Sequence, residues 1–449
     1  MQDEMISRYA VSVPRYTSYP TAPHFSPQTG ASEQEAWMRA IPAGGHVSLY
    51  VHIPYCDRLC WFCGCNTKQI RRYDPVRTYL DHLHKEIAHA GTLVPQTARV
   101  TALHFGGGSP TMLEADDIRR LGAQLRASFA FADDAEISVE MDPNDMSEDR
   151  FDAFAAIGMT RASLGVQDFD PRVQAAINRE QTFEQTRSVV DGVRARGVGS
   201  VNLDILYGLP HQTVESVAAT VRACLELDPD RIALFGYAHV PWMKKHQTMI
   251  GEDHLPGTLE RYRQQEHAAE ILLAAGYEII GFDHFAKPGD SMALAARNGT
   301  LKRNFQGYTV DDAGTLIGLG ASSISQYAEG YIQNSPATAD YQRRVAETGL
   351  AAVRGYELTA QDRMRAAVIE QLMCNFAFSR DWVTETFGEM GRVIQDEADY
   401  LAASDRDGLF LRDGSMYRVT ETGRPFVRVI ASHFDEYFGR GAARHSAAV

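Results

Sequence analysis

Short apolar runs rich in β-branched and aromatic residues alternate along the chain with longer stretches that carry apolar residues at helical spacing. The strand-like runs begin at Ser48, Val100, Glu136, Arg161, Val201 and Arg231. A short run from Glu278 is a further candidate strand. Helical periodicity fills residues 75–87, 116–125 and 183–194 between them. Strands that alternate with helices predict βαβ units and a parallel sheet. Six units favour an α/β fold, a partial (β/α)6-type TIM-like barrel; a complete barrel and an open doubly wound sheet are the alternatives.

Polar and glycine-rich segments follow the predicted strands. They are the cysteine-rich segment from Cys56, the turn Gly106-Gly107-Gly108, Glu140, Gln167-Asp168, Asp204 and Ala238-His239. In β/α barrels the active site is built at the carboxyl ends of the strands. Exposure of strand ends to solvent explains one or two polar residues. It explains poorly a triple glycine, a cysteine loop and two carboxylates at one rim, so we predict a functional site there.

Three charged residues near this rim have both a functional and an ordinary explanation. Asp204 lies in the apolar run V-N-L-D-I-L, where an unpaired carboxylate is costly, so either a ribose diol or a buried salt bridge is its expected partner. Glu140 can accept a hydrogen bond from an ammonium or a ribose hydroxyl, or it can be a surface carboxylate. Arg179 can bind a carboxylate through two parallel hydrogen bonds, or it can be an exposed arginine at a helix end.

The pattern changes after about residue 350. Residues 361–376 predict an amphipathic helix, further helices are expected near Trp382 and Ile394, and a hairpin is expected around Asp413-Gly414. Together these elements indicate a small, mainly helical, winged-helix-like domain. The last 99 residues hold 12 Arg, no Lys and 15 acidic residues, which is a poor electrostatic match for DNA. We therefore interpret this domain as a structural cap.

The same patterns divide the chain into three parts. The first stretch has no sustained periodicity, the second holds the barrel units and the third holds the cap. The predicted parts are an N-terminal extension (1–45), a barrel domain (46–345) and a C-terminal domain (346–449).

Composition and charge narrow the function classes. The 449 residues include 44% hydrophobic and 23% charged residues, which is ordinary globular composition. A net charge of −14 argues against nucleic acid and anionic membranes as partners. An anionic substrate would need a local basic patch. With no signal-peptide pattern and no apolar run of about 20 residues, we expect a cytoplasmic protein, and nothing in the sequence requires more than a monomer.

Four of the six cysteines fall within ten residues. Cys56, Cys60 and Cys63 have the spacing C-x3-C-x2-C, and Cys65 follows two residues later. Zinc ribbons use two separated C-x2-C pairs and thioredoxin-type sites use one, so neither fits cleanly. Cytoplasmic thiols stay reduced, which favours a metal site over disulfides. Three thiolates can hold three irons of a [4Fe–4S] cluster, leaving the fourth iron open to a substrate or cofactor.

The motif at Cys56, Cys60 and Cys63, with the aromatic Phe62 before its last cysteine, resembles the signature of the radical S-adenosylmethionine (SAM) superfamily. Further segments resemble the oxygen-independent coproporphyrinogen III oxidase family over essentially the whole chain: C-G-C-N, P-R-Y-T-S-Y-P-T, N-R-E-Q, L-D-I-L-Y-G-L-P and R-N-F-Q-G-Y-T. The one departure at motif positions is Ser109, where threonine is common. The resemblance implies that SAM is cleaved and that two propionates of coproporphyrinogen III become vinyl groups, giving protoporphyrinogen IX.

The resemblance also implies roles for individual residues. Two SAM molecules are expected. The first would contact Tyr50, Gly107, Glu140 and Ile324. The second would contact Phe62, Gly108, Ser109, Gln167, Arg179, Asp204 and Ala238. Phe305 and Gln306, with Glu140, are the expected catalytic residues. Cys65 would lie beside the SAM pair without binding iron, although Cys65 or His52 as a fourth ligand is an alternative.

The expected substrate has four carboxylates and therefore needs cations. The candidates are Arg15, Lys68, Arg71, Arg72, Lys302 and Arg303, each of which is singly an ordinary surface charge. An electron donor and an electron acceptor, both unidentified, are also required. Three alternatives are a haem-directed radical SAM enzyme, a haem chaperone and a structural zinc site. Tight haem binding would support the chaperone, and zinc without iron or sulfide would support the last.

Overall fold

The computed structural model describes residues 3–439, and its main feature is a twelve-stranded mixed sheet. The predicted strands are present as β1 (His46–Ile53), β4 (Arg99–Gly107), β5 (Phe131–Met141), β6 (Arg161–Gln167), β7 (Ser200–Tyr207) and β8 (Arg231–Gly236). They lie side by side in chain order, and each neighbouring pair is parallel. A doubly wound sheet reverses its strand order, whereas this order is that of a barrel. The prediction of a partial barrel is confirmed.

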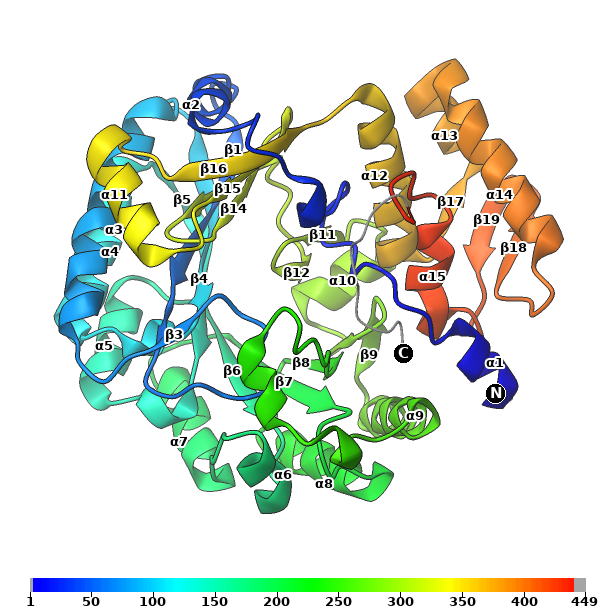
Figure 1. The fold of residues 1–449 in the computed structure, drawn as a ribbon, viewed down its shortest axis with the longest axis horizontal. Helices are drawn as coiled ribbons and strands as arrows, with labels where there is room; N and C mark the ends of the chain where they lie inside the picture. Colours follow the sequence, from blue (N-terminus) through cyan, green and yellow to red (C-terminus); the bar gives the residue numbers. More distant parts are fainter. Residues whose placement is uncertain (1–2, 440–449) are drawn as a thin grey trace.

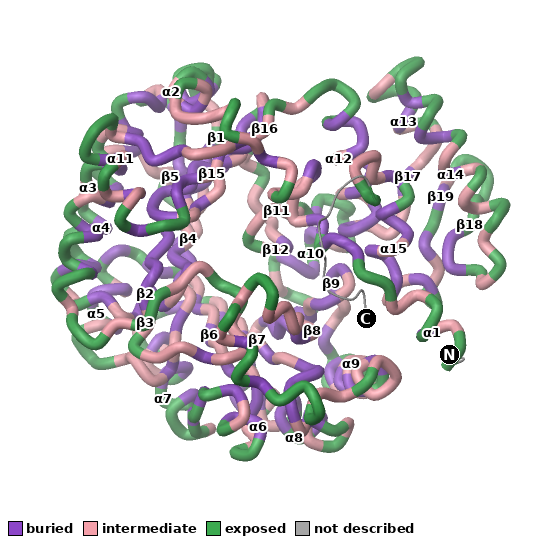
Figure 2. Tube along the Cα trace, viewed as in Figure 1, coloured by how far each residue is buried: buried purple, intermediate pink, exposed green. Residues whose placement is uncertain are grey.

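Helices cover the outer face of this parallel block (Figure 1). They are α3 (Asp74–Leu93), α4 (Ala115–Ser128), α5 (Glu148–Ala156), α6 (Pro171–Ala176), α7 (Phe183–Arg194), α8 (Val214–Leu225) and α9 (Thr258–Ala274). The three helical stretches predicted from periodicity lie within α3, α4 and α7. Figure 2 shows the strands mostly buried and the helices exposed on their outward sides, so the main core lies between these two layers.

Additional strands extend both edges of the parallel block. On the β1 side, β13 (Thr315–Leu319) is parallel to β1, and three antiparallel strands follow: β14 (Ile324–Gln326), β15 (Gly330–Asn334) and β16 (Ala352–Glu357). On the β8 side lie β10 (His284–Ala286) and β9 (Glu278–Ile280), which is the further strand expected from Glu278. The helices α10 (Ser291–Arg297) and α11 (Thr338–Thr348) belong to these edge regions.

A short hairpin of β11 (Lys302–Asn304) and β12 (Gly307–Thr309) contacts both sides of the open barrel. Just after β12, the Asp311 carboxylate accepts a hydrogen bond from the Ser48 hydroxyl on β1. Tyr308 on β12 packs edge-on against His284 of β10, with ring centroids 5.3 Å apart. The hairpin therefore places the R-N-F-Q-G-Y-T segment inside the partial barrel.

The C-terminal region contains the elements expected from its pattern. The helices are α12 (Ala360–Asn375), α13 (Arg380–Phe387), α14 (Arg392–Ser404) and α15 (Val427–Ser432). The strands β17 (Ala377–Ser379), β18 (Phe410–Asp413) and β19 (Met416–Val419) form a separate three-stranded sheet. The β18–β19 hairpin turns at Asp413-Gly414 as predicted. Residues 440–449 of the predicted C-terminal domain lie outside the described part of the chain.

One of the predicted part boundaries does not coincide with the packing. The boundary at 345/346 falls inside α11, and β16 beyond it pairs with β15 in the large sheet. A break between β16 and α12 fits the sheet better, and we propose it as the boundary. The strands β14 to β16 are short and leave little periodic signal, so the sequence pattern does not mark this boundary.

The N-terminal 45 residues act as a strap rather than a loose extension. They include α1 (Asp3–Tyr9) and α2 (Ala31–Arg39), and Figure 1 shows the segment crossing the molecule between them. Tyr16 and Tyr19 are buried in the C-terminal core, whereas Trp37 is buried in the main core. The segment therefore ties the two cores together. Among residues 3–439, no helix is both long and apolar enough to cross a membrane.

Candidate functional site

The cysteine loop is closed by two short parallel strands, β2 (Tyr55–Cys56) and β3 (Lys68–Gln69). The loop and the carboxyl ends of β4 to β7 line a cavity of about 180 Å³. Its lining includes these predicted site residues: Cys56, Cys60, Cys63, Phe62, Gly107, Gly108, Ser109, Glu140, Gln167, Arg179 and Asp204. Cys65 also lines it. Residues predicted from six separate segments therefore meet in one space, although their individual roles stay predictions.

The environments of the thiols differ. Burial raises the pKa of Cys56 to about 12 and also raises the pKa of Cys60. The pKa of Cys63 is lowered, because Cys65 donates to its sulfur through both the thiol and the backbone N–H, the latter at 3.3 Å. Cys65 itself is exposed. Buried thiols with raised pKa values become ligands only when metal replaces their protons.

The donor set suits an iron–sulfur cluster. Cys56, Cys60 and Cys63 come from one loop and line one cavity. In the described part of the chain, no three His, Cys, Asp or Glu side chains converge closely enough to hold a single metal ion. A tetrahedral zinc site would require such convergence, whereas a cluster spreads its thiolates around a larger body. The zinc alternative therefore gains no support.

Residues 244–247, which were not predicted from the sequence, hydrogen-bond to the backbone of the cysteine loop. Gln247 donates to the carbonyl oxygens of Phe62 (2.9 Å) and Ala238 (3.3 Å). His246 Nε2 lies 2.7 Å from the Cys63 carbonyl oxygen, and Lys244 donates to that of Cys65 at 2.9 Å. Ala238 does not line the cavity, but Gln247 ties it to the loop. Contacts made through backbone carbonyls leave no sequence motif on the loop itself.

The glycine turn is required by its protein neighbours. A Cβ at Gly106 would lie 2.7 Å from Glu140 Oε1, and one at Gly108 would lie 2.5 Å from Thr67 Oγ1. Gly107 has a φ of 121°, which side chains rarely adopt. Since all three positions are sterically constrained, one glycine would not suffice. The turn is fastened at the base of the cysteine loop by the Ser109 N–H, which donates to the Tyr55 carbonyl oxygen at 2.9 Å.

Glu140 is an ionised acceptor at the end of β5. Its Oε1 lies 3.0 Å from His104 Nε2, and its Oε2 accepts from the Gly107 N–H at 3.2 Å. Burial opposes ionisation, but these bonds outweigh it and the pKa of Glu140 is lowered. The ring of Tyr50 stacks on His104, with centroids 5.7 Å apart. Tyr50 is thereby placed beside Glu140, its predicted partner at the first SAM site.

Arg179 is buried, which excludes the exposed helix-end interpretation. Its side chain is 9% exposed, and Nη1 donates to Asp142 Oδ2 at 2.9 Å. The same Nη1 lies 3.6 Å from the Cys60 sulfur, and Nη2 donates to the Gly165 carbonyl oxygen at 2.8 Å. Asp142 was not predicted from the sequence. The pair brings a cation to the wall of the cysteine cavity.

Asp204 accepts hydrogen bonds from two neutral side chains. Asn202 donates to Oδ1 at 2.8 Å and Ser163 to Oδ2 at 3.4 Å. Burial raises the pKa of Asp204 to about 6. Within residues 3–439 no ion pair involves Asp204, so the salt-bridge interpretation receives no support. A ribose diol therefore remains its expected partner.

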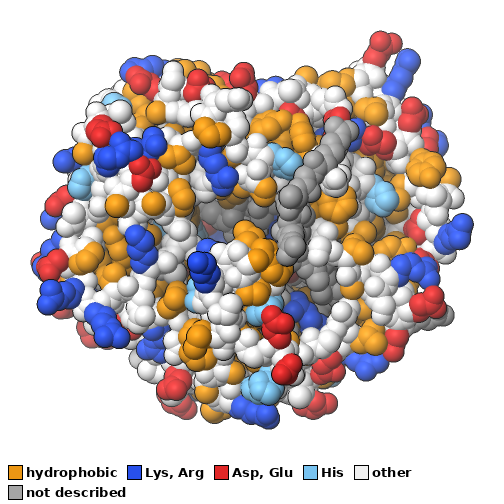
Figure 3. All heavy atoms as spheres, viewed as in Figure 1, with side chains coloured by type: hydrophobic (Ala, Val, Ile, Leu, Met, Phe, Trp, Pro, Cys, Tyr) orange, Lys and Arg blue, Asp and Glu red, His pale blue; other side chains and the backbone are white. Residues whose placement is uncertain are grey.

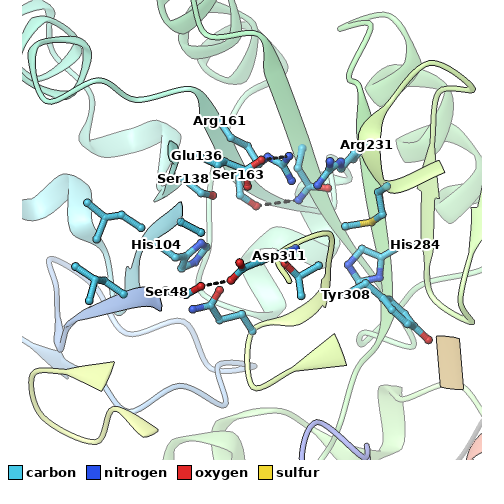
Figure 4. A pocket seen from close by; sticks show the side chains of 17 residues that line it. Ser48, His104, Glu136, Ser138, Arg161, Ser163, Arg231, His284, Tyr308 and Asp311 are labelled. Carbon is cyan, nitrogen blue, oxygen red and sulfur yellow. Dashed lines mark hydrogen bonds and ion pairs between the residues drawn. The ribbon is translucent and has the colours of Figure 1, made fainter. Parts of the chain in front are cut away.

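A second cavity, of about 120 Å³, lies deeper in the barrel and shares Ser163 with the first. Figure 4 shows its polar lining, with Arg161 paired to Glu136 (2.6 Å) and the Ser48–Asp311 bond. Gln306 lines this cavity from the β11–β12 turn. His104 also lines it, so the partner of Glu140 stands between the two cavities.

Four predicted site residues lie outside both cavities: Tyr50, Ala238, Phe305 and Ile324. Phe305 packs edge-on against Phe25 and Tyr331, at 6.4 and 5.5 Å between ring centroids. Ile324 lies near Tyr50: the register pairs Tyr50 with Gly318, where an added Cβ would lie 2.8 Å from the Ile324 carbonyl oxygen. Ile324 is thus close to the first predicted SAM site, and Phe305 belongs to the aromatic cluster behind the hairpin turn.

The candidate cations separate into two groups. Arg303 donates to the backbone carbonyl of Arg15 at 3.3 Å, so these two are brought together beside the barrel mouth. Lys302 is instead 3.5 Å from Glu370, and Lys68 donates to the Thr338 hydroxyl. Arg71 and Arg72, which follow β3, are exposed.

Comparison with known proteins agrees with this site. The sequence profile of the Radical SAM superfamily matches residues 50–224. An oxygen-independent coproporphyrinogen III oxidase from Paracoccus denitrificans is 46% identical over 100% of this chain and 99% of its own length. The corresponding protein of Bradyrhizobium diazoefficiens is 45% identical, with 97% of each chain covered.

A solved structure leads to the same group. Coproporphyrinogen III oxidase from Escherichia coli, described as a radical SAM enzyme, superposes with a TM-score of 0.92. It shares 39% identity, and the match covers 98% of this chain and 99% of that one. The chain therefore belongs to the oxygen-independent coproporphyrinogen III oxidase family of radical SAM enzymes.

Proposed function

We propose that this chain converts two propionate side chains of coproporphyrinogen III to vinyl groups, giving protoporphyrinogen IX for anaerobic haem biosynthesis. Full-length similarity to enzymes of that name supports the substrate. The observation that carries the proposal is the cavity in which three cysteines of one loop meet the glycine turn and Asp204. Each conversion removes one hydrogen atom, one CO2 and one electron, so an electron acceptor is required as a partner, and the cluster requires an electron donor.

Cys56, Cys60 and Cys63 would hold a [4Fe–4S] cluster. When bound, the cluster and SAM together supply a radical able to take a hydrogen atom from a propionate. Cys65 is the odd member, because it is exposed and its N–H donates to the Cys63 sulfur. We therefore assign Cys65 to hydrogen bonding at the cluster rather than to iron binding.

The residues around the cavity supply two sets of contacts for SAM. The first set is Tyr50, Gly107, Glu140 and Ile324, where the ionised Glu140 can accept from an ammonium group. The second set is Phe62, Gly108, Ser109, Gln167, Arg179, Asp204 and Ala238, where Asp204 can accept from a ribose diol. Two SAM molecules per chain match the two decarboxylations. The polar donors and acceptors orient the cofactors.

Gln306 is the proposed substrate-contacting residue on the hairpin, with Phe305 packed beside it. Gln306 is exposed at the turn and lines the second cavity, so its amide can reach a bound tetrapyrrole. Phe305 holds the turn through Phe25 and Tyr331. The proposal takes the protein as a monomer in the cytoplasm, where thiols stay reduced and can bind metal.

The substrate is tested by comparing tetrapyrroles without oxygen. The reconstituted, reduced protein is given SAM with coproporphyrinogen III, with haem or with neither, and 5′-deoxyadenosine and tetrapyrrole products are quantified. We expect deoxyadenosine to increase with coproporphyrinogen III alone. An increase with haem alone would indicate a haem-directed radical SAM enzyme instead. Tight haem binding without SAM cleavage would favour a chaperone.

A further inference from the structure

Arginines from four separate segments gather at the carboxyl ends of β7 and β8. Arg15 comes from the N-terminal strap, Arg261 from α9, Arg303 from the β11–β12 hairpin and Arg428 from α15. Arg15 donates to the Gly236 carbonyl oxygen at 3.1 Å, and Arg303 donates to the Arg15 carbonyl oxygen at 3.3 Å. These contacts bring the strap and the hairpin to the end of β8.

Arg261 and Arg428 complete the group. A Cβ at Gly236 would lie 3.2 Å from an Arg261 guanidinium nitrogen, so Arg261 reaches the same glycine as Arg15. Arg428 donates to the Pro14 carbonyl oxygen at 3.1 Å and to that of Val13 at 2.5 Å, immediately before Arg15. The term arginine cluster is used below for Arg15, Arg261, Arg303 and Arg428.

Positive charge in the cluster exceeds the negative charge beside it. Within the described residues, neither Arg15, Arg261 nor Arg303 forms an ion pair with a carboxylate. Two acids lie nearby: the Asp283 Oδ1 is already 2.6 Å from His284 Nδ1, and Glu370 accepts from the Arg303 backbone N–H at 3.3 Å. Burial of unbalanced cations is costly, so such a group indicates an anion that binds there.

Several guanidinium donors also lack acceptors. Arg303 Nε, Arg303 Nη1 and Arg261 Nε are buried without a hydrogen-bond partner in the described structure. Burial, reinforced by the neighbouring arginines, lowers the pKa of Arg15 and of Arg261, and it lowers the pKa of Arg428 to about 9. Arg15 nevertheless stays accessible to solvent, as expected for a side chain that lines a recess.

Aromatic rings hold these planar groups in place. The Arg303 guanidinium lies 4.5 Å from the centroid of Tyr308 and 5.2 Å from that of Phe282. Arg261 lies 5.9 Å from the ring of Tyr207. Tyr308 and His284 also form one wall of the second cavity, where Figure 4 shows them side by side. The arginine cluster therefore adjoins the cavity that Gln306 lines.

We propose that Arg15, Arg261 and Arg303 bind a propionate carboxylate of the tetrapyrrole substrate. This inference rests on the proposed function. Guanidinium groups bind carboxylates through paired hydrogen bonds, and a protein of net charge −14 needs a local concentration of cations to hold a tetracarboxylate. On the face in Figure 3, Lys and Arg side chains are scattered among acidic ones, and they form no large basic patch. The arginine cluster is thus a local concentration of positive charge of the kind that such a ligand requires.

The test measures binding rather than turnover. Coproporphyrin III, the stable oxidised form with the same four propionates, is titrated by fluorescence into the reconstituted wild-type protein and into Arg261→Met and Arg303→Met. Each loss of a charged hydrogen bond should raise the dissociation constant about tenfold or more. Arg222→Met, on the exposed face of α8, is the matched control and should bind as the wild type does. For a porphyrin with only two propionates, Arg261→Met and Arg303→Met should raise the dissociation constant less.

Four further outcomes decide the matter. The proposal is overturned if both Met variants bind coproporphyrin III as tightly as the wild type does and keep the absorbance of the iron–sulfur cluster. If a Met variant misfolds, Arg303→Lys decides, because it keeps the charge but loses the planar fork; wild-type binding in that variant also overturns the proposal. Wild-type protein that binds coproporphyrin III but does not convert coproporphyrinogen III refutes the proposed function alone, and the variants still test the arginines. Wild-type protein that does not bind coproporphyrin III refutes the arginine site.

Discussion

Arg179 lies between a predicted iron ligand and a carboxylate: its Nη1 is 3.6 Å from the Cys60 sulfur and 2.9 Å from Asp142 Oδ2. The side chains of Arg179 and Asp142 are only 9% and 13% exposed. A buried pair of this kind is costly to break, because the remaining charge has no partner. Arg179 therefore holds the cavity wall in place as well as placing positive charge beside Cys60.

We predict that Arg179→Gln lowers the free energy of unfolding by about 3 kcal/mol, since it leaves Asp142 buried and unpaired. Chemical unfolding measures the change. The double variant Arg179→Gln with Asp142→Asn should recover part of the loss, because neither charge then remains. A single variant as stable as the wild type would show that water, rather than Arg179, satisfies Asp142.

The ligand assignment predicts a sharp contrast among the four cysteines. Cys56→Ser, Cys60→Ser and Cys63→Ser should each lose the cluster, because three thiolates are the smallest set proposed to hold it. Cys65→Ser should keep it. Iron and sulfide analysis with visible absorption after anaerobic reconstitution measures both. A full iron complement in any of the first three, or its loss in Cys65→Ser, would refute the assignment.

Asp204→Asn should make the protein more stable at neutral pH. The pKa of Asp204 is raised to about 6, so the folded state favours the protonated form and its stability falls as pH rises from the unfolded pKa through about 6. The Asn variant lacks this penalty. We expect a gain of about 1–2 kcal/mol at pH 7 and none below pH 4. If Asp204→Asn and the wild type were equally stable at pH 7 as well as below pH 4, the result would contradict the buried environment of Asp204.

The same variant should bind one SAM instead of two. Asn can still accept one hydrogen bond but lacks the second carboxylate oxygen, so the proposed second site weakens while the first, at Glu140, is unaffected. Equilibrium binding of SAM to reconstituted protein gives the stoichiometry. In the wild type, binding at the second site should weaken as pH falls below about 6, where Asp204 becomes protonated. Two tightly bound SAM molecules in Asp204→Asn would refute the role of Asp204.

Gln306→Ala should lower kcat/KM for coproporphyrinogen III about tenfold, through the loss of one hydrogen bond to the substrate. The cluster and SAM binding should stay unchanged. Lys302→Gln on the same hairpin is the control, because Lys302 is already beside Glu370. Equal losses in both variants would indicate a general disturbance of the hairpin instead of a substrate contact.

The repeating part of the fold was predictable because the strands of a parallel sheet are buried and read as apolar runs. All six strands predicted for the parallel sheet and the Glu278 strand were found. The strands β13 to β16 were missed, since they are only three to six residues long and their pattern is weak. The strap was also missed, because Tyr16 and Trp37 are buried individually, without periodicity, in two different cores.

Eleven predicted site residues meet in one cavity because their motifs stand at strand ends, where topology brings them together. Residues that act across the fold carried no such signal. Arg261 and Arg428 come from helices far apart in the chain, and Gln247 reaches the cysteine loop only through backbone carbonyls. Asn202 is the missed residue that the sequence pattern could have revealed. It stands two residues before Asp204, on the same face of β7.

The central claim is that a propionate loses a hydrogen atom to SAM-derived carbon and then loses CO2. The most direct measurement uses coproporphyrinogen III deuterated at the β-carbons of its propionates, incubated anaerobically with reduced, reconstituted protein and SAM. Mass spectrometry should find deuterium in 5′-deoxyadenosine and a tetrapyrrole in which two propionates have become vinyl groups. Unlabelled deoxyadenosine beside a tetrapyrrole that keeps all four propionates would contradict the account.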